Sequence, residues 1–196
     1  MQKRIGAPLS KDVILSLESG DYVLVSGTIY VARDAAHKKM CEALQNGEPL
    51  PFDIEGQIIY YAGPCPARPG NIAGPFGPTT SGRMDKFAPV LMERGLKGMI
   101  GKGDRDDSVI DSMIKNGAVY FAAVGGLGAY IATVIEEQQV IAYGELGAEA
   151  LFRLKVKDFP AIVAIDSKGS NLYRTEPKKY ENKFEGLYTD SLKESV

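Results

Sequence analysis

The spacing of apolar residues predicts strands and helices that alternate through the first two thirds of the chain. Residues 21–31, DYVLVSGTIYV, place apolar side chains at alternating positions, the period of a strand with one buried face. From about Asp34 the apolar side chains recur every three or four positions, as on one side of a helix. Asn46 and Gly47, a pair typical of helix ends, predict where that helix stops.

The same patterns predict further elements. Ser10 is placed to cap a short helix that Gly20 ends. The other predicted helices lie over about 84–95 and 109–116, and the other predicted strands over 56–63, 96–101, 118–124, 138–144, 151–159 and 160–166. Strands that first alternate with helices and later follow one another predict an α/β fold with a mixed sheet and helices on one side.

Length and composition fit one globular domain. The 196 residues are 44% hydrophobic and 24% charged, which is enough to bury one core. No linker divides the chain, so we expect a single domain over residues 1–196 with a polar tail from about residue 178. A formal net charge of −2 provides no basic surface for nucleic acid, and we expect no nucleic-acid partner.

Two stretches bear on localisation. The start, MQKRIGAPLSKD, lacks the apolar region of a signal peptide, so we expect a cytoplasmic protein with reduced cysteines. Residues 118–135 carry no charge over 18 positions, the length at which a membrane helix has to be considered. Gly125, Gly126 and Gly128 interrupt this stretch, and a buried strand followed by a short helix or turn fits it better. We therefore expect no membrane span.

Candidate metal ligands are few. The chain has two cysteines, Cys41 and Cys65, and one histidine, His37. Two cysteines make no disulfide framework, and with one histidine they fall short of the four ligands of an ordinary zinc site. We expect this chain alone to bind no metal.

A long stretch rich in Gly and Pro runs from the strand at Tyr60 to the predicted helix. It ends in GPFGPTTSGR, residues 74–83, where Thr79, Thr80 and Ser81 precede a predicted helix start. Backbone N–H groups, three hydroxyls and the guanidinium of Arg83 together suit a phosphate or carboxylate. The alternative is a plain helix cap after ordinary turns, and the spacing leaves both interpretations open.

Two more cationic residues stand at ends of predicted strands. Lys102 follows the strand 96–101, and Arg33 lies between the strand 21–31 and the next helix. Ligands of α/β proteins gather at such strand ends, although either residue alone also fits a solvated loop. His37 lies one helical turn after Arg33, where it is either a surface or satisfied histidine or part of the same site. With Arg83, these cations would suit a small dicarboxylate.

The stretches that carry these residues resemble a known family. They are GPCPARPGNIAGPFGPTTSGRMDKFAP, LSLESGDYVLVSGTIYVARDAAH, GMIGKGDR and ELGAEALFRLKVKDFPAIVAIDSKG. Over about residues 10–170 the chain resembles the β subunit, or C-terminal domain, of class I iron–sulfur fumarate hydratases and the related L-tartrate dehydratases. The resemblance implies a swivelling β/β/α three-layer domain and a reversible addition of water to a dicarboxylate.

The resemblance also implies roles for single residues. Arg33, Arg83 and Lys102 match positions that bind substrate carboxylates. Thr79 matches a residue implicated in proton transfer together with an aspartate of the other subunit. Thr80 and Ser81 are candidate substrate-binding residues beside it, whereas Cys65 matches no cluster ligand.

Cofactor and partner follow from the same resemblance. In this family a [4Fe–4S] cluster is held by three cysteines of the α subunit or N-terminal domain, a part that this chain does not contain. The chain is therefore expected to need an α subunit for activity, and a homodimer is compatible with the family.

Several functions remain open from the sequence. The first is the β subunit of a fumarate hydratase, and the alternative is an L-tartrate dehydratase β subunit. A carboxylate-binding module without catalysis would keep the fold and the anion site. A nucleotide-phosphate binder would rest on the Gly-rich loop alone, which lacks the G-x-x-x-x-G-K-[ST] pattern of a P-loop.

Overall fold

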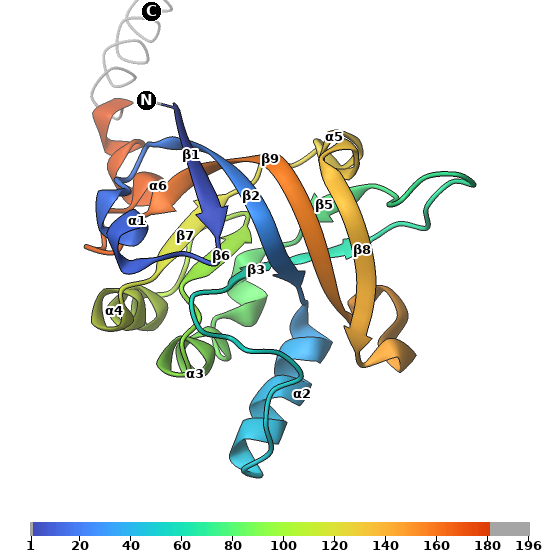
Figure 1. Ribbon diagram of the computed structural model, residues 1–196. Helices are drawn as coiled ribbons and strands as arrows, with labels where there is room; N and C mark the ends of the chain where they lie inside the picture. Colours follow the sequence, from blue (N-terminus) through green and yellow to red (C-terminus); the bar gives the residue numbers. More distant parts are fainter. Residues whose placement is uncertain (1, 181–196) are drawn as a thin grey trace, which may run out of the picture.

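The computed structural model describes residues 2–180, and Figure 1 shows their arrangement. The strands are β1 (Gln2–Ala7), β2 (Tyr22–Val31), β3 (Ile58–Tyr60), β4 (Ala62–Pro64), β5 (Phe76–Pro78), β6 (Gly98–Gly101), β7 (Val119–Ala122), β8 (Ile135–Ala142) and β9 (Leu151–Ile165). The α-helices are α1 (Lys11–Ser16), α2 (Asp34–Gln45), α3 (Ala88–Glu93), α4 (Asp107–Asn116), α5 (Gly128–Thr133) and α6 (Leu172–Thr175). Two 3₁₀ segments are η1 (Ser81–Met84) and η2 (Gly144–Glu149).

The described strands form a mixed sheet that closes on itself. β2, β3, β6 and β7 pair in parallel, and β9 pairs antiparallel with both β7 and β2, so these five strands make a barrel-like ring. β1 extends the ring beside β2, and β8 extends it beside β9. The short strands β4 and β5 form a separate antiparallel hairpin. The prediction of a mixed sheet in an α/β fold is confirmed.

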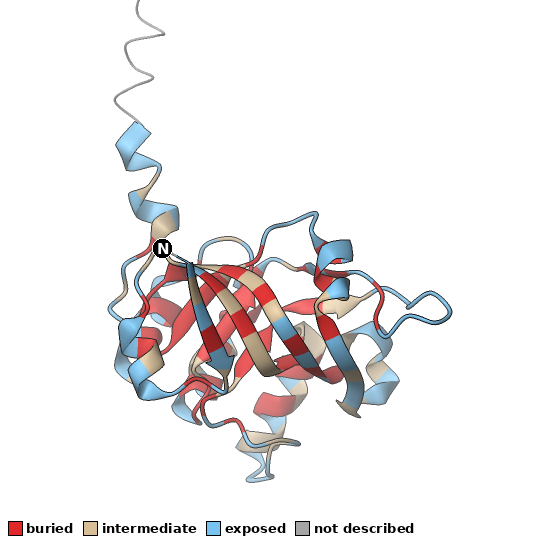
Figure 2. Cartoon of the chain, turned by 45° about the horizontal axis from the view of Figure 1, so that its top comes forward, coloured by how far each residue is buried: buried red, intermediate tan, exposed pale blue. Residues whose placement is uncertain are grey.

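Two hydrophobic cores divide the molecule into three layers. One core lies between the strands β1, β2, β9 and β8 and the strands β3, β6 and β7, and includes Val23, Ile58 and Phe159. The other lies between β3, β6 and β7 and the helices α2, α3 and α4, and includes Met40 and Met99. Figure 2 shows the buried residues gathered in the central strands, with exposed residues along the outer strands, the helices and the loops. Alternate residues of the middle strands thus serve different cores, which gives the expected β/β/α layers.

Local sequence patterns predicted several helix ends correctly. Ser10 caps α1 by accepting a hydrogen bond from the Val13 N–H at 3.3 Å, as predicted. Asn46 is the C-cap of α2. Gly117 closes α4 with a φ of +61°, in the left-handed region that favours glycine.

Two predicted elements differ in the structure. The helix predicted over 84–95 is divided into η1 and α3 by a turn, and Pro89, which lacks an N–H, lies in the first turn of α3. The strands predicted over 151–159 and 160–166 are one strand, β9. Asp158 takes a φ of +54° inside it and donates its N–H to Ser26 Oγ at 2.9 Å. This local irregularity produces the break that the sequence suggests.

The uncharged stretch and the polar tail were the other two features considered in the sequence. The uncharged stretch 118–135 is divided among β7, α5 and the start of β8. Among the described residues, no helix is long and apolar enough to cross a membrane. The polar tail predicted from about residue 178 lies almost entirely outside the described residues.

Candidate active site

The long Gly/Pro stretch folds back on itself as the β4–β5 hairpin. Gly63 pairs with Gly77, and the Cys65 N–H donates to the Pro75 carbonyl at 2.9 Å. A Cβ at Gly74 would lie 2.2 Å from the Cys65 carbonyl oxygen, so only glycine lets the two sides approach. The hairpin returns the chain to its base, where the Thr79 N–H donates to the Tyr61 carbonyl at 2.8 Å. Thr79 is therefore held, half-buried, beside the end of β3.

The segment after Thr79 is attached to the end of β6. Thr80 pairs in parallel with Lys102, and the Ser81 N–H donates to the Lys102 carbonyl at 2.9 Å. Both Thr80 and Lys102 are exposed. Thr80 precedes η1 without making a side-chain cap hydrogen bond within the described chain, so a helix cap does not account for its hydroxyl. Because η1 has only four residues, a helix dipole contributes little here.

Ser81 differs from the two threonines. It is completely buried, and its Oγ lies 2.9 Å from the Tyr120 hydroxyl. A Cβ at Gly101 would lie 2.0 Å from Ser81 Oγ, so the glycine at the end of β6 makes this close packing feasible. The structure thus turns the Ser81 hydroxyl into the interior, away from the side on which Thr80 is exposed.

Arg33 and Arg83 approach the same surface from two sides. Arg33 is the N-cap residue of α2, and its Nη2 lies 3.0 Å from Oε1 of Glu149 in η2. Arg83 is exposed in η1 and lines a surface hollow together with Asp34, Lys86 and Glu149. Arg33 also lies against the hairpin, because a Cβ at Gly63 would be 3.3 Å from Arg33 Cδ.

The structure therefore gathers the predicted residues around the base of the hairpin. Thr79, Thr80 and Arg83 follow one another along the segment that leaves the hairpin, and Lys102 pairs with this segment. Arg33 is in contact with the other strand of the same hairpin. Three cations and two hydroxyls near one surface suit an anion with two carboxylates.

His37 belongs to the interior beneath this surface. It is completely buried on α2, and its Nδ1 lies 2.9 Å from the Arg33 carbonyl oxygen. Burial, with a smaller contribution from the nearby Arg105, lowers the pKa of His37 to about 4, so the ring is neutral at pH 7. Its Nε2 has no hydrogen-bond partner within residues 2–180. His37 thus supports the N-terminus of α2 from inside.

A buried ion pair beneath η1 was not predicted from the sequence. Arg105 Nε lies 2.6 Å from Asp85 Oδ1, and the Asp106 N–H donates to Asp85 Oδ2 at 2.8 Å. Neither side chain is more than 5% exposed. The guanidinium also lies over the rings of Tyr61 and Tyr120. The two partners lie in the stretches GRMDK and GDRDD, each of which contains an arginine and an acidic residue. Only the fold shows that these two stretches meet.

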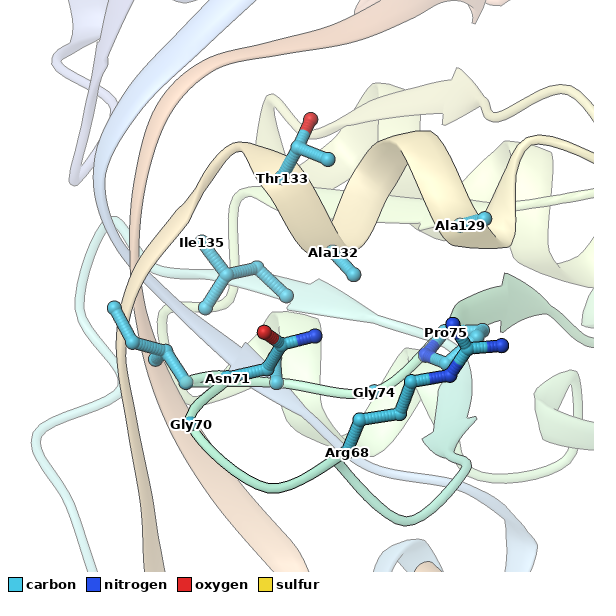
Figure 3. Close-up of a pocket in the computed structure, with 11 residues that line it drawn as sticks. Arg68, Gly70, Asn71, Gly74, Pro75, Ala129, Ala132, Thr133 and Ile135 are labelled. Carbon is cyan, nitrogen blue, oxygen red and sulfur yellow. The ribbon is translucent and has the colours of Figure 1, made fainter.

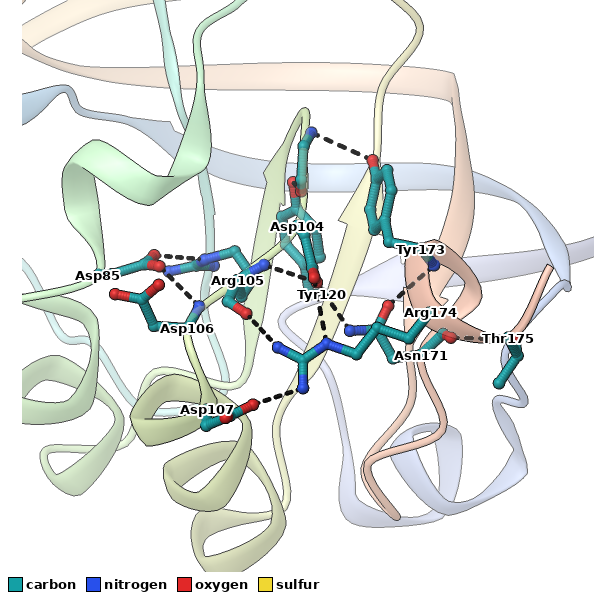
Figure 4. A network of polar contacts seen from close by, with 11 residues as sticks. Asp85, Asp104, Arg105, Asp106, Asp107, Tyr120, Asn171, Tyr173, Arg174 and Thr175 are labelled. Carbon is teal, nitrogen blue, oxygen red and sulfur yellow. Dashed lines mark hydrogen bonds and ion pairs between the residues drawn. The ribbon is translucent and has the colours of Figure 1, made fainter. Parts of the chain in front are cut away.

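The loop after β6 is also held from the C-terminal side, as Figure 4 shows. Asp104 accepts hydrogen bonds from the Asn171 Nδ2 at 2.7 Å and from the Arg174 Nε at 3.1 Å. Arg174 in addition forms an ion pair with Asp107. The Tyr173 hydroxyl accepts from the Gly103 N–H at 3.2 Å. The backbone that carries Lys102 is thus fixed by the segment around α6.

A second hollow lies beside the hairpin loop (Figure 3). The loop contributes Arg68 and Asn71, and α5 contributes Ala129 and Ala132. The helix approaches β5 closely at Gly128, where a Cβ would lie 3.1 Å from the Gly77 nitrogen. This packing supports the hairpin at β5, whereas Arg33 lies against β4.

The residues present do not fit an iron–sulfur cluster bound by this chain. A [4Fe–4S] cluster needs three or more thiolate ligands, and the chain has only two cysteines. Cys41 is buried on α2, and Cys65 is exposed at the end of the hairpin. Among residues 2–180 there is no group of three or more His, Cys, Asp and Glu that could hold a metal ion.

Comparisons with known proteins agree on one family. Residues 2–176 match the model of the family described as fumarase C-terminus. The chain is 41% identical to fumarate hydratase 2 of Leishmania major over 156 residues, which are 79% of this chain and 28% of that protein. It is also 41% identical to the aerobic class I fumarate hydratase of Escherichia coli (strain K12) over 152 residues, 76% of this chain and 28% of that protein.

A third relative is matched along almost its whole length. The chain is 37% identical to a putative L(+)-tartrate dehydratase subunit beta of Methanocaldococcus jannaschii over 185 residues, 91% of this chain and 95% of that protein. The chain thus spans about 28% of the length of the two fumarate hydratases but nearly all of this subunit.

Proposed function

The chain belongs to the fumarase C-terminus family, and from this premise we propose that it is the β subunit of a two-chain hydro-lyase that reversibly hydrates fumarate to L-malate. The observation that carries the proposal is the attachment of the Thr79–Arg83 segment to Lys102 at the base of a hairpin that also contacts Arg33. Fumarate carries two carboxylates, so at least two separate cationic groups are needed to bind and orient it.

Each residue of the site has a proposed task. Arg83 and Arg33 offer planar guanidinium groups that bind carboxylates in a fixed orientation, and Lys102 adds a single positive charge. The exposed Thr80 hydroxyl is a further donor to a carboxylate. Ser81, which is buried, is proposed to hold the segment in place instead.

Thr79 is proposed to take part in proton transfer at the substrate carbon. A threonine hydroxyl is a weak acid and a weak base, so it needs a partner that accepts or supplies the proton. We assign that role to a carboxylate of the partner subunit. The backbone hydrogen bond from Thr79 to Tyr61 fixes where the hydroxyl can reach.

The partner is proposed to be an α subunit that carries the [4Fe–4S] cluster. Two cysteines on different elements cannot supply the ligands, and a relative that this chain matches over 95% of its length is named a subunit beta. The site on this chain is therefore one wall of a larger active site. We place the enzyme in the cytoplasm, where the cysteines stay reduced.

An L-tartrate dehydratase β subunit is the second candidate function. It is favoured by the match to 95% of the putative tartrate dehydratase subunit, whereas the fumarate hydratases are much longer proteins. Tartrate differs from malate by one hydroxyl. A group that pairs with this hydroxyl could discriminate strongly between the two substrates.

An anaerobic hydratase assay tests these proposals. This chain is mixed with its candidate α subunit and a reconstituted cluster, and fumarate, malate and L-tartrate are offered separately. Turnover of fumarate and malate with both chains, lost with Thr79→Ala and with Arg83→Ala, is the expected result. Turnover of tartrate alone selects the second candidate. A stable complex with an intact cluster and no turnover contradicts both and leaves a carboxylate-binding module.

A further inference from the structure

The 3₁₀ segment η2 is clamped onto α2 next to the candidate active site. Lys39 Nζ on α2 lies 2.5 Å from Glu145 Oε1, and Arg33 Nη2 lies 3.0 Å from Glu149 Oε1. The backbone of η2 also packs against the hairpin, because a Cβ at Gly63 would be 2.9 Å from the Ala148 carbonyl oxygen. Glu149 is thus brought to Arg33 by a segment far away in the sequence.

These contacts hold the Arg33 side chain on two sides. On one side, the Glu149 carboxylate forms an ion pair with Arg33 Nη2. On the other side lies Gly63, where an added Cβ would be 3.3 Å from Arg33 Cδ and 3.5 Å from Arg33 Nη1. The Arg33 side chain is 24% exposed. Within the described part of the chain, the Nε group has no hydrogen-bond partner, and the Asp34 carboxylate is 3.9 Å from it. The Nε atom is buried as well as unpartnered, so the guanidinium is anchored at Nη2 and only its Nη donors stay available to a ligand.

We propose that Glu149 is a positioning residue, which fixes the Arg33 guanidinium so that its remaining donors face a substrate carboxylate. The proposal rests on the proposed function, in which Arg33 binds substrate. An arginine side chain has many rotamers, and the loss of their entropy on binding weakens the affinity for the ligand. An ion pair already formed in the free protein removes most of that cost.

The charge of Glu149 has to be compatible with an anionic substrate. Glu149 and Asp34 line the hollow beside Arg83, but so do Lys38 and Lys86. The three cations of this hollow outnumber its two acids, and Arg33 adds a fourth positive charge. The local field thus still favours a dicarboxylate, and Glu149 acts on Arg33 rather than repelling the substrate. If Glu149 were instead a competitor for Arg33, its removal would improve substrate binding.

The first test needs only this chain. Nitrogen-15 NMR of arginine guanidinium groups reports how fast each group rotates about its Nε–Cζ bond, and the Arg33 signal is assigned from Arg33→Lys. We expect slow rotation of Arg33 in the unaltered chain and fast rotation in Glu149→Ala. Glu149→Gln, which keeps an acceptor oxygen but loses the charge, should lie between them. The matched control is Glu93→Gln, which alters the exposed ion pair with Lys115 away from η2 and should leave the Arg33 rotation unchanged.

The second test uses the complex reconstituted with the α subunit. Glu149→Ala is expected to raise the KM for the dicarboxylate about fivefold, as for the loss of one oriented hydrogen bond, and to change kcat much less. Glu93→Gln should leave both constants unchanged. A lower KM in Glu149→Ala, or an Arg33 that rotates as freely as the exposed Arg83 in the unaltered chain, overturns the proposal. A complex without any turnover contradicts the proposed function, while the NMR experiment still decides whether Glu149 restrains Arg33.

Discussion

Ser81 Oγ lies 2.9 Å from the Tyr120 hydroxyl, and Tyr120 donates its own proton to the Gly103 carbonyl at 2.9 Å. Since the Tyr120 proton is used in this way, Ser81 is the donor in the first bond. The pair connects the segment that carries Thr79 and Arg83 with the loop that carries Lys102. Two parts of the candidate site are therefore joined below the surface by side chains that do not reach it.

This relationship predicts that Ser81→Ala lowers the free energy of unfolding by about 1 kcal/mol, because one buried hydrogen bond is lost. The matched control is Thr80→Ala. Thr80 is exposed, and its replacement should change the free energy of unfolding by less than about 0.5 kcal/mol. Urea unfolding at pH 7 measures both values. Equal losses in the two variants would show that the Ser81–Tyr120 bond does not stabilise the fold.

The buried pair of Asp85 and Arg105 predicts a larger effect. Asp85→Ala leaves the Arg105 guanidinium buried without its carboxylate, and we expect a loss of about 3–5 kcal/mol. Replacing both residues by Leu removes both charges and should cost less than Asp85→Ala alone.

The control for this prediction is an exposed ion pair. Lys115 Nζ lies 3.3 Å from Glu93 Oε1, with both side chains more than half exposed. Glu93→Ala should therefore change stability by less than about 1 kcal/mol. Urea unfolding of the three variants compares the two environments. A loss for Asp85→Ala no greater than that for Glu93→Ala would mean that the Asp85–Arg105 contact is not a buried pair in solution.

Local sequence patterns were sufficient to predict most of the strands and helices that form the layers. The strand over 21–31 and the helix from Asp34 follow from residues close together in the chain, and so do the ends at Ser10 and Gly117. The partners of Arg105 and Arg33 could not be predicted in this way. A helix and a strand, α3 and β6, separate Asp85 from Arg105 along the chain. Glu149 reaches Arg33 only because η2 packs on the hairpin. Such contacts depend on topology and not on spacing.

In the candidate site, too, some features could be predicted from local sequence and others could not. The cations and hydroxyls were recognisable as residue types, and the Gly/Pro stretch marked a special backbone path. The direction of each side chain was not recognisable. Ser81 follows Thr80 directly but points into the interior, since the backbone pairs with Lys102 at this position as a strand does and side chains alternate. For His37 the sequence left a surface or satisfied residue and a part of the site both open; in the structure it is buried, with only one nitrogen bonded among the described residues.

His37 makes the stability of the protein depend on pH. Its pKa is lowered by burial from 6.5 to about 4, so the unfolded chain binds the extra proton more readily than the folded one. The stabilisation by neutral His37 is present above pH 6.5 and is lost as the pH falls toward 4. Between pH 7 and pH 5 the loss should be about 2 kcal/mol.

Urea unfolding of the unaltered chain and of His37→Gln separates this contribution from that of the carboxylates. Glutamine does not titrate, so the free energy of unfolding of the variant should fall less between pH 7 and pH 5. The difference between the two pH dependences is the quantity to compare with the expected 2 kcal/mol. Parallel pH dependences would show that His37 is not buried in its neutral form.

The hairpin depends on a single glycine at its closure. A Cβ at Gly74 would lie 2.2 Å from the Cys65 carbonyl and 2.5 Å from the Pro66 carbonyl, and both are backbone atoms that cannot simply turn away. We expect Gly74→Ala to open the loop and to destabilise the chain by about 1–3 kcal/mol. At Gly77 in β5 a Cβ would meet nothing within 4 Å among the described residues, so Gly77→Ala is the matched control with an effect below about 0.5 kcal/mol.

Hydrogen exchange distinguishes a local opening from general destabilisation. In Gly74→Ala the Cys65 N–H should exchange faster, because its hydrogen bond to the Pro75 carbonyl is lost. The β2 and β9 amides should exchange only as fast as the lower free energy of global unfolding requires. The Thr79 N–H, bonded to Tyr61 at the base of the hairpin, indicates how far the opening spreads toward the site. Unchanged exchange at Cys65 would mean that the loop tolerates the methyl group, and the close approach at Gly74 would then not determine the hairpin.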